Sequence, residues 1–158
     1  MCCFSYLLPR ALTTILIYLL LSDIIIVIDE TESQDPYIDI IQAKILGIFQ
    51  EVISSPLAAR FALIVFRDYQ PDNKAVNAVR IYPFTNDMEV LCRTLSTLRA
   101  FGRGNGPEAL NPALYNALEA QWNEDAMKVV ILVTGSLPHG IGGTHDDYLY
   151  RSPDGKPV

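Results

Sequence analysis

Cysteines and basic residues are scarce in this sequence. Its 158 residues include three cysteines, an odd number without a Cys-x-x-Cys spacing, which excludes a disulfide framework and a cysteine-based zinc site. Basic residues are also few: 12 Lys and Arg stand against 18 Asp and Glu, a formal net charge of -6. Because such a chain repels nucleic-acid phosphates, we expect no nucleic-acid partner.

Catalytic signatures are missing as well, so we expect no enzyme. No residue set resembles a Ser-His-Asp or Cys-His arrangement. One glycine-rich loop, residues 102–106, could attract an anion through its backbone N–H groups, but no Gly-Lys-Ser/Thr follows it. A nucleotide-binding enzyme domain that uses this loop remains the alternative. The two histidines and two aspartates of residues 139–147 match no standard zinc spacing and predict an ordinary polar loop.

The composition that remains predicts one globular domain. Half of the residues are hydrophobic and 19% are charged, which is enough apolar surface for a core and unlike a disordered chain. At roughly 100 to 200 residues per domain, the length allows one domain or a piece of one.

The first 22 residues are strongly apolar and leave three interpretations open. A secretory signal has the required apolar stretch here, but its basic start is Arg10 alone and no cleavage site follows. A membrane anchor needs about 20 uninterrupted apolar residues, and Asp23 ends the run, although Cys2 and Cys3 offer acylation sites. The third interpretation is an extension that is not part of the fold, either a wrongly chosen start or the edge of a fragment. We expect a cytoplasmic protein, with a secreted or membrane-anchored one as the alternative.

From residue 23 onward, the apolar pattern alternates between strands and helices. Unalternated β-branched runs predict strands buried on both faces, as in parallel sheets, at residues 23–28, 60–66 and 128–133. Residues 78–84 alternate and contain Pro83, which predicts a half-exposed edge strand. Apolar residues at three- and four-residue steps predict helices over residues 37–54, 87–98 (capped by Thr85 or Asn86) and 107–122.

This order of elements predicts an α/β fold: a Rossmann-like open, mostly parallel sheet with helices on both faces. Ligands bind such sheets beyond the carboxyl ends of the strands. After the first strand, Asp29, Thr31 and Ser33 place a carboxylate and two hydroxyls at alternate positions of one loop. Oxygen atoms of this kind suit Mg²⁺, although Asp29 could instead cap a helix.

A family resemblance rests on four segments, which are residues 23–33, 65–69, 102–110 and 128–140. The Asp-x-Thr-x-Ser loop after a buried strand resembles the metal-ion-dependent adhesion site of the von Willebrand factor type A (VWA) domain. The later segments, with Gly-Asn-Gly-Pro-Glu and Leu-Pro-His-Gly, resemble the variant attached to alpha-type protein kinases.

The resemblance implies a protein-binding or adhesion module. In that family the metal keeps one coordination position open, and an acidic residue of the protein partner completes it. Asp29, Thr31 and Ser33 would form the first metal loop, with Asn105 in the second loop as a further ligand. If the parent protein carries an alpha-type kinase, this part would regulate or localise it.

Two departures from the family pattern predict an impaired metal site. Gly135 stands where the family has Asp, and Asn105 offers a neutral carbonyl in place of an acid. Glu32 stands where the family has Gly, and a side chain there implies either strain or a changed loop path. Glu30 or Glu32 could partly restore the charge. We expect Mg²⁺ binding to be weak or lost, with Mn²⁺ or Ca²⁺ as other candidates.

The expected organisation has three parts: an extension over residues 1–22, a partial VWA-like domain over 23–140 and an irregular segment over 141–158. A full domain of this family continues with a further strand and helix, so we expect a C-terminally truncated fold that is poorly soluble. A nonfunctional gene fragment is therefore a further alternative. Membrane contact through residues 1–22 remains open.

Overall fold

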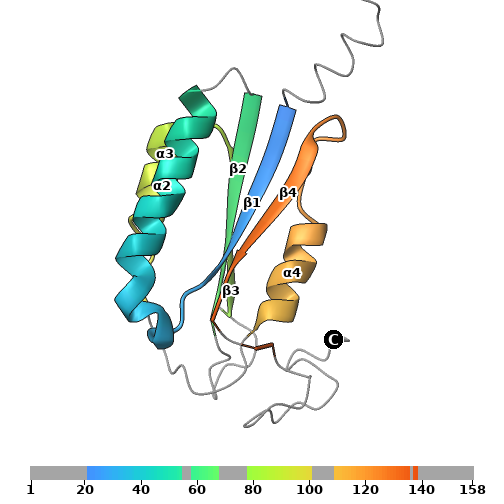
Figure 1. The fold of residues 1–158 in the computed structure, drawn as a ribbon. Coiled ribbons are helices and arrows are strands. Elements are labelled where there is room, and N and C mark those ends of the chain that lie inside the picture. Colours follow the sequence, from blue (N-terminus) through green and yellow to red (C-terminus); the bar gives the residue numbers. More distant parts are fainter. Residues whose placement is uncertain (1–20, 55–57, 68–77, 101–108, 136, 139–158) are drawn as a thin grey trace, which may run out of the picture.

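The computed structural model describes residues 21–54, 58–67, 78–100, 109–135 and 137–138. Its strands are β1 (Leu21–Asp29), β2 (Ala58–Phe66), β3 (Val79–Thr85) and β4 (Met127–Val133). They form a sheet in the order β3-β2-β1-β4, in which β1 is parallel to β2 and β4, and β3 is antiparallel to β2 (Figure 1). This mostly parallel sheet confirms the predicted α/β class.

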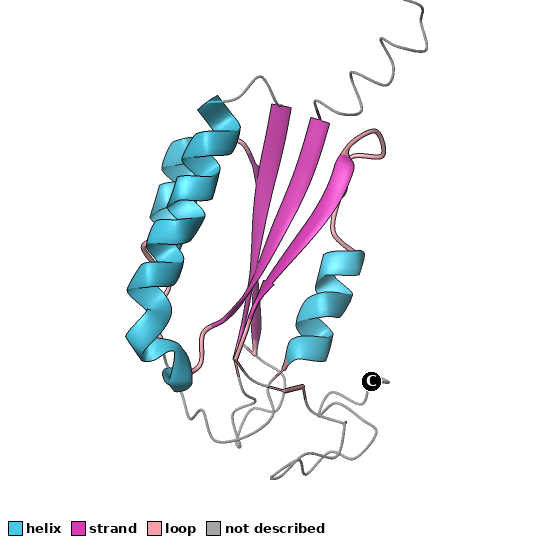
Figure 2. Cartoon of the chain, viewed as in Figure 1, coloured by secondary structure: helices cyan, strands magenta, loops and turns pink. Residues whose placement is uncertain are grey.

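Helices cover both faces of the sheet, as predicted. A 3-10 helix, η1 (Glu32–Tyr37), leads into α2 (Ile38–Ser54), which lies with α3 (Met88–Leu95) on one face. On the other face lies α4 (Leu110–Leu118) (Figure 2). The structure thus has three layers, with the sheet in the middle.

Strand β1 is central because its sequence is apolar on both sides. Ile26 and Ile28 pack in the core beneath α2, which includes Phe49, while Ile25 and Val27 pack in a second core beneath α4. All four β1 side chains are fully buried. A strand covered on both faces needs apolar residues at every position, which explains the unalternated run.

Strand β4 corrects the prediction of a third strand buried on both faces. Its Val129 and Ile131 pack against the core beneath α2, but Val130 is 46% exposed and Leu132 is 43% exposed on the other face. The core beneath α4 takes its strand residues from β1, β2 and β3, and includes none from β4. In the described part of the chain, β4 is therefore a half-covered edge strand.

The helix ends also differ from the predictions. Asp87, and not Thr85 or Asn86, is the N-cap of α3: its Oδ1 accepts hydrogen bonds from the N–H groups of the second and third helical residues at 2.8 and 3.4 Å. Helix α4 ends four residues before Trp122, whose Nε1 donates to the Ala117 carbonyl at 2.8 Å. Residues 107 and 108, where that helix was predicted to begin, lie outside the described residues.

The structure also bears on the amino-terminal segment. Strand β1 begins at Leu21, two residues before the predicted start of the first strand. Among the described residues, no helix has the length and apolarity needed to cross a membrane. The signal and anchor interpretations depend on residues 1–20, which lie outside the residues that the structure describes.

Candidate functional site

The loop that follows β1 is folded by hydrogen bonds to Asp29, the last residue of the strand. Its Oδ1 accepts from the N–H of Thr31 at 3.0 Å and from Thr31 Oγ1 at 2.7 Å. An aspartate that binds the residue two positions later turns the chain sharply. The N–H of Gln34 then donates to the Thr31 carbonyl at 2.9 Å, which opens η1.

This turn brings the three predicted oxygen-bearing side chains together. Thr31 Oγ1 lies 3.0 Å from Ser33 Oγ, so Asp29, Thr31 and Ser33 form one hydrogen-bonded chain at the carboxyl edge of the sheet. Asp29 and Thr31 are fully buried, whereas Ser33 is exposed. The group therefore has a rigid interior end and an end that solvent can reach.

A fourth side chain, Thr134, joins the group, and the sequence analysis missed it. Its Oγ1 donates to Asp29 Oδ2 at 3.1 Å. The sheet register explains this contact: Ile28 of β1 pairs with Val133 of β4, so the next residue of each strand reaches the same point. Reading the residue after every parallel strand would have found Thr134.

The donor set fits a hard cation by its chemistry. It consists of one carboxylate and three hydroxyls, and Mg²⁺ prefers such oxygen atoms and keeps several of its waters. The part of the chain that the structure describes holds no group of three or more His, Cys, Asp or Glu side chains suited to a metal ion. Any cation here would thus be held mainly by neutral oxygens. Asn105, the fourth predicted ligand, lies outside the described residues.

Glu30 does not supply the missing negative charge, because its carboxylate has other partners. It is 3% exposed, it pairs with Nη2 of Arg80 on β3, and its Oε1 accepts from the N–H of Arg99 at 2.9 Å. The N–H of Glu30 also donates to the Phe66 carbonyl at 2.8 Å. Glu30 therefore ties the loop of residues 29–33 to β2, to β3 and to the segment after α3.

Glu32 and Gly135 are two of the positions at which the chain departs from the resembled family, and the structure describes both. Glu32 is exposed at the start of η1, in helical backbone that any residue adopts. Gly135 follows Thr134, and a Cβ atom placed on it would lie 3.0 Å from Nε2 of Gln34. The Gln34 side chain thus stands where a side chain of residue 135 would project.

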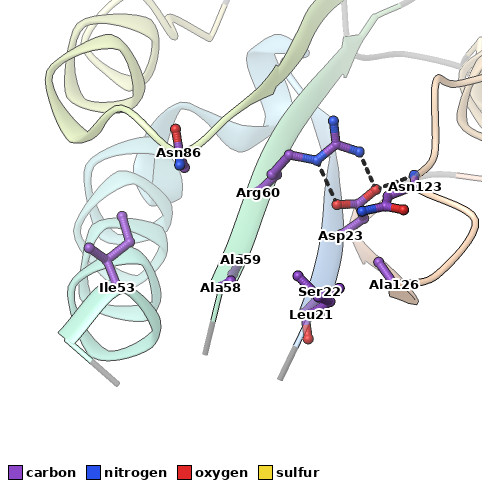
Figure 3. Close-up of a pocket in the computed structure, with 10 residues that line it drawn as sticks. All are labelled: Leu21, Ser22, Asp23, Ile53, Ala58, Ala59, Arg60, Asn86, Asn123 and Ala126. Atoms are coloured by element: carbon purple, nitrogen blue, oxygen red, sulfur yellow. Dashed lines mark hydrogen bonds and ion pairs between the residues drawn. The ribbon is translucent and has the colours of Figure 1, made fainter. Parts of the chain in front are cut away.

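A separate pocket of about 410 Å³ lies at the opposite, amino edge of β1 and β2 (Figure 3). Beside it, buried Asp23 accepts from Arg60 Nε at 2.8 Å and from the N–H of Asn123 at 2.7 Å. Burial acts to raise the pKa of Asp23, but these hydrogen bonds and the Arg60 charge outweigh it, so the pKa lies below its usual value. Both carboxylate oxygens are engaged, which indicates a structural role.

The comparisons with known proteins agree with an α/β fold and point to one relative. No family model matches the chain. In an alignment of 138 residues that covers 84% of the chain, the chain is 28% identical to "Alpha-protein kinase vwkA" of Dictyostelium discoideum, and it spans about a fifth (21%) of that protein. Among solved structures, the open conformation of the pilus adhesin SpaC from Lactobacillus rhamnosus GG is similar, with a TM-score of 0.60 and 15% identity.

The coverage and the sequence identity of these two matches determine which conclusions they support. The structural match covers 74% of this chain and 15% of the adhesin chain, and at 15% identity it concerns the fold alone. The kinase match is a weak sequence similarity to a small part of a larger protein. The chain therefore has weak homology to an alpha-protein kinase and a fold that also occurs in a pilus adhesin.

Proposed function

We propose that this chain is a protein-interaction module that holds Mg²⁺ at the carboxyl edge of its sheet and binds an acidic side chain of a protein partner through it. The observation that carries the proposal is the hydrogen-bonded group of Asp29, Thr31, Ser33 and Thr134. These residues come from two segments about 100 positions apart in sequence, which is what a built site requires, as opposed to a local turn.

The charge of the group favours an anionic partner. Asp29 is the single carboxylate of the group, because Glu30 is paired with Arg80. A divalent cation held by one carboxylate and neutral hydroxyls keeps a net positive charge, and its remaining coordination position attracts an anionic oxygen. The low number of charges also implies weak affinity for the cation itself.

Each residue has a distinct part in this proposal. Asp29, Thr31 and Ser33 would hold the ion, and the exposed Ser33 marks the side from which a partner approaches. Thr134 orients the Asp29 carboxylate by donating to its Oδ2. We propose binding and no catalysis, since nothing in this group resembles a catalytic arrangement.

The similar proteins give this proposal a context. One is named an alpha-protein kinase, of which the chain matches a fifth, and the other is a pilus adhesin. We therefore propose that the chain is a binding part of a kinase-like protein, where it would regulate or localise the catalytic part. A metal-dependent contact with an acidic partner would serve either role.

Calorimetric titration of the purified chain with Mg²⁺ and Mn²⁺ tests the proposal. We expect saturable binding in roughly the 10⁻⁴ to 10⁻³ M range, the weak end of protein sites for Ca²⁺, because affinity falls with the number of charged ligands. Asp29→Asn should abolish it. Asp35→Asn, which removes an exposed carboxylate from η1, is the matched control and should leave it intact. Absence of heat with the unaltered chain would overturn the proposal.

A further inference from the structure

Gln34 has a buried side chain with no role assigned so far. It is the one buried residue of η1, at 9% exposure, although the rest of that short helix faces solvent. Its Nε2 lies 3.4 Å from Ser33 Oγ, the exposed end of the metal loop. Burial of an amide costs free energy unless its polar atoms find partners, and Ser33 Oγ is the partner of the amide nitrogen.

On its other side, the Gln34 amide faces Gly135, which follows Thr134 after the end of β4. A Cβ atom on Gly135 would lie 3.0 Å from Gln34 Nε2, closer than about nine in ten real Cβ contacts. The Gln34 amide therefore lies in space that a side chain at residue 135 would enter. The amide occupies the space between Gly135 and Ser33.

We propose that Gln34 is a ligand of the cation, with its carbonyl Oε1 supplying the oxygen that Gly135 lacks. This inference rests on the proposed Mg²⁺ site and names a further residue of it. A half-turn about the last side-chain torsion exchanges the amide nitrogen and oxygen. A cation bound at Ser33 repels the amide N–H and attracts the carbonyl, so it favours the orientation in which Oε1 faces the site.

The arrangement also determines the charge of the site. Gln34 contributes an oxygen without a negative charge, so Asp29 remains the single carboxylate among the described ligands. Gln34→Glu adds one charge next to the cation and should tighten Mg²⁺ binding at least tenfold. Gln34→Met keeps the buried volume but removes the oxygen, and should weaken binding by about tenfold.

A double substitution tests whether Gln34 and Gly135 share one position. Gly135→Asp alone should gain little affinity, because its Cβ atom meets the Gln34 amide. Gln34→Ala opens that space, so the Gln34→Ala/Gly135→Asp protein should bind Mg²⁺ at least tenfold more tightly than the unaltered chain. Gln50→Glu adds the same charge at an exposed position of α2 and serves as the control.

The experiment is calorimetric titration of these proteins with Mg²⁺, together with the electron paramagnetic resonance spectrum of bound Mn²⁺ and a thermal melt of each variant. The expected result is weaker binding by Gln34→Met, tighter binding by Gln34→Glu and by the double variant, and no change with Gln50→Glu. If Gln34→Met unfolds at a lower temperature than the unaltered chain, the Mg²⁺ affinities of Gln34→Glu and of the double variant test the inference in its place.

Two results would overturn the inference, and they can be told apart. If the unaltered chain binds Mg²⁺ in an Asp29-dependent way but the Gln34 variants have the same affinity and the same Mn²⁺ spectrum, Gln34 is no ligand and the proposed function stands. If the unaltered chain binds no cation, both the inference and the proposed function fail.

Discussion

Glu30 should anchor the loop of residues 29–33, and Glu30→Gln tests this. The carboxylate is 3% exposed and pairs with Arg80, and its other oxygen accepts from the Arg99 N–H at 2.9 Å. In the variant, the Arg80 guanidinium loses its counter-charge while its buried Nε already has no hydrogen-bond partner in the described structure. The glutamine oxygen can still accept from the Arg99 N–H, but the amide NH₂ then faces the Arg80 guanidinium, so the variant loses both the charge and the hydrogen bond to Arg80.

The expected loss follows from the exposure of the two partners. Removing one member of a fully buried ion pair costs about 3–5 kcal/mol. The Arg80 side chain is 34% exposed, and solvent screens part of its charge. We therefore expect Glu30→Gln to lower the free energy of unfolding by about 2 kcal/mol, and the loosened loop to weaken Mg²⁺ binding as well.

Urea denaturation followed by circular dichroism measures the change. Glu89→Gln is the control, because Glu89 pairs with Arg93 at 3.1 Å on the surface of α3, where both side chains are well exposed. Such a surface pair contributes about 0.3–0.5 kcal/mol. If Glu30→Gln costs no more than Glu89→Gln, the anchoring role of Glu30 is refuted.

Two further predictions concern other contacts of the sheet edges. Because the pKa of Asp23 is lowered in the folded state, its pairing stabilises the fold above the unfolded pKa of about 3.9 and is lost as the pH falls through the lower folded value. Asp23→Asn should thus flatten the decline of unfolding free energy below about pH 4, and an unchanged slope would contradict this. Thr134→Val removes the donor to Asp29 Oδ2 and should weaken Mg²⁺ binding about fivefold in calorimetry. Thr85→Val, toward the opposite edge of the sheet where Thr85 pairs with Phe61 of β2, should leave Mg²⁺ binding unchanged.

The central part of the fold could be predicted because local pattern and burial coincide there. Strands β1 and β2 are covered on both faces, and their unalternated runs show it directly. The edge position of β3 was also predicted, from its alternation and Pro83. Strand β4 has the same kind of sequence as β1, yet one of its faces lacks cover from α4, and composition cannot show which helix lies over which strand.

The candidate site likewise has one part that the sequence predicts and another part that it does not. The turn made by Asp29 and Thr31 is local and follows from residue types two positions apart. The contact of Glu30 with Arg80 joins residues 50 positions apart and depends on sheet register, which one sequence does not reveal. The contact of Thr134 with Asp29 joins residues 105 positions apart, and the sequence indicates only that each residue stands at the end of a predicted strand. Because the pairing with Arg80 cannot be read from the sequence, the sequence analysis predicts that the Glu30 carboxylate could add negative charge to the loop of residues 29–33. The metal roles of Asp29, Thr31, Ser33 and Asn105 remain predictions.

The most direct test of the central claim is the broadening of backbone amide NMR signals by substoichiometric Mn²⁺. We predict that the signals of Thr31, Ser33 and Thr134 broaden first, since these residues surround the proposed ion. Signals of Asp23 and Asn123, at the opposite edge of the sheet, should stay sharp. Broadening centred on the opposite edge, or none that Mg²⁺ reverses, would contradict a cation site at the end of β1.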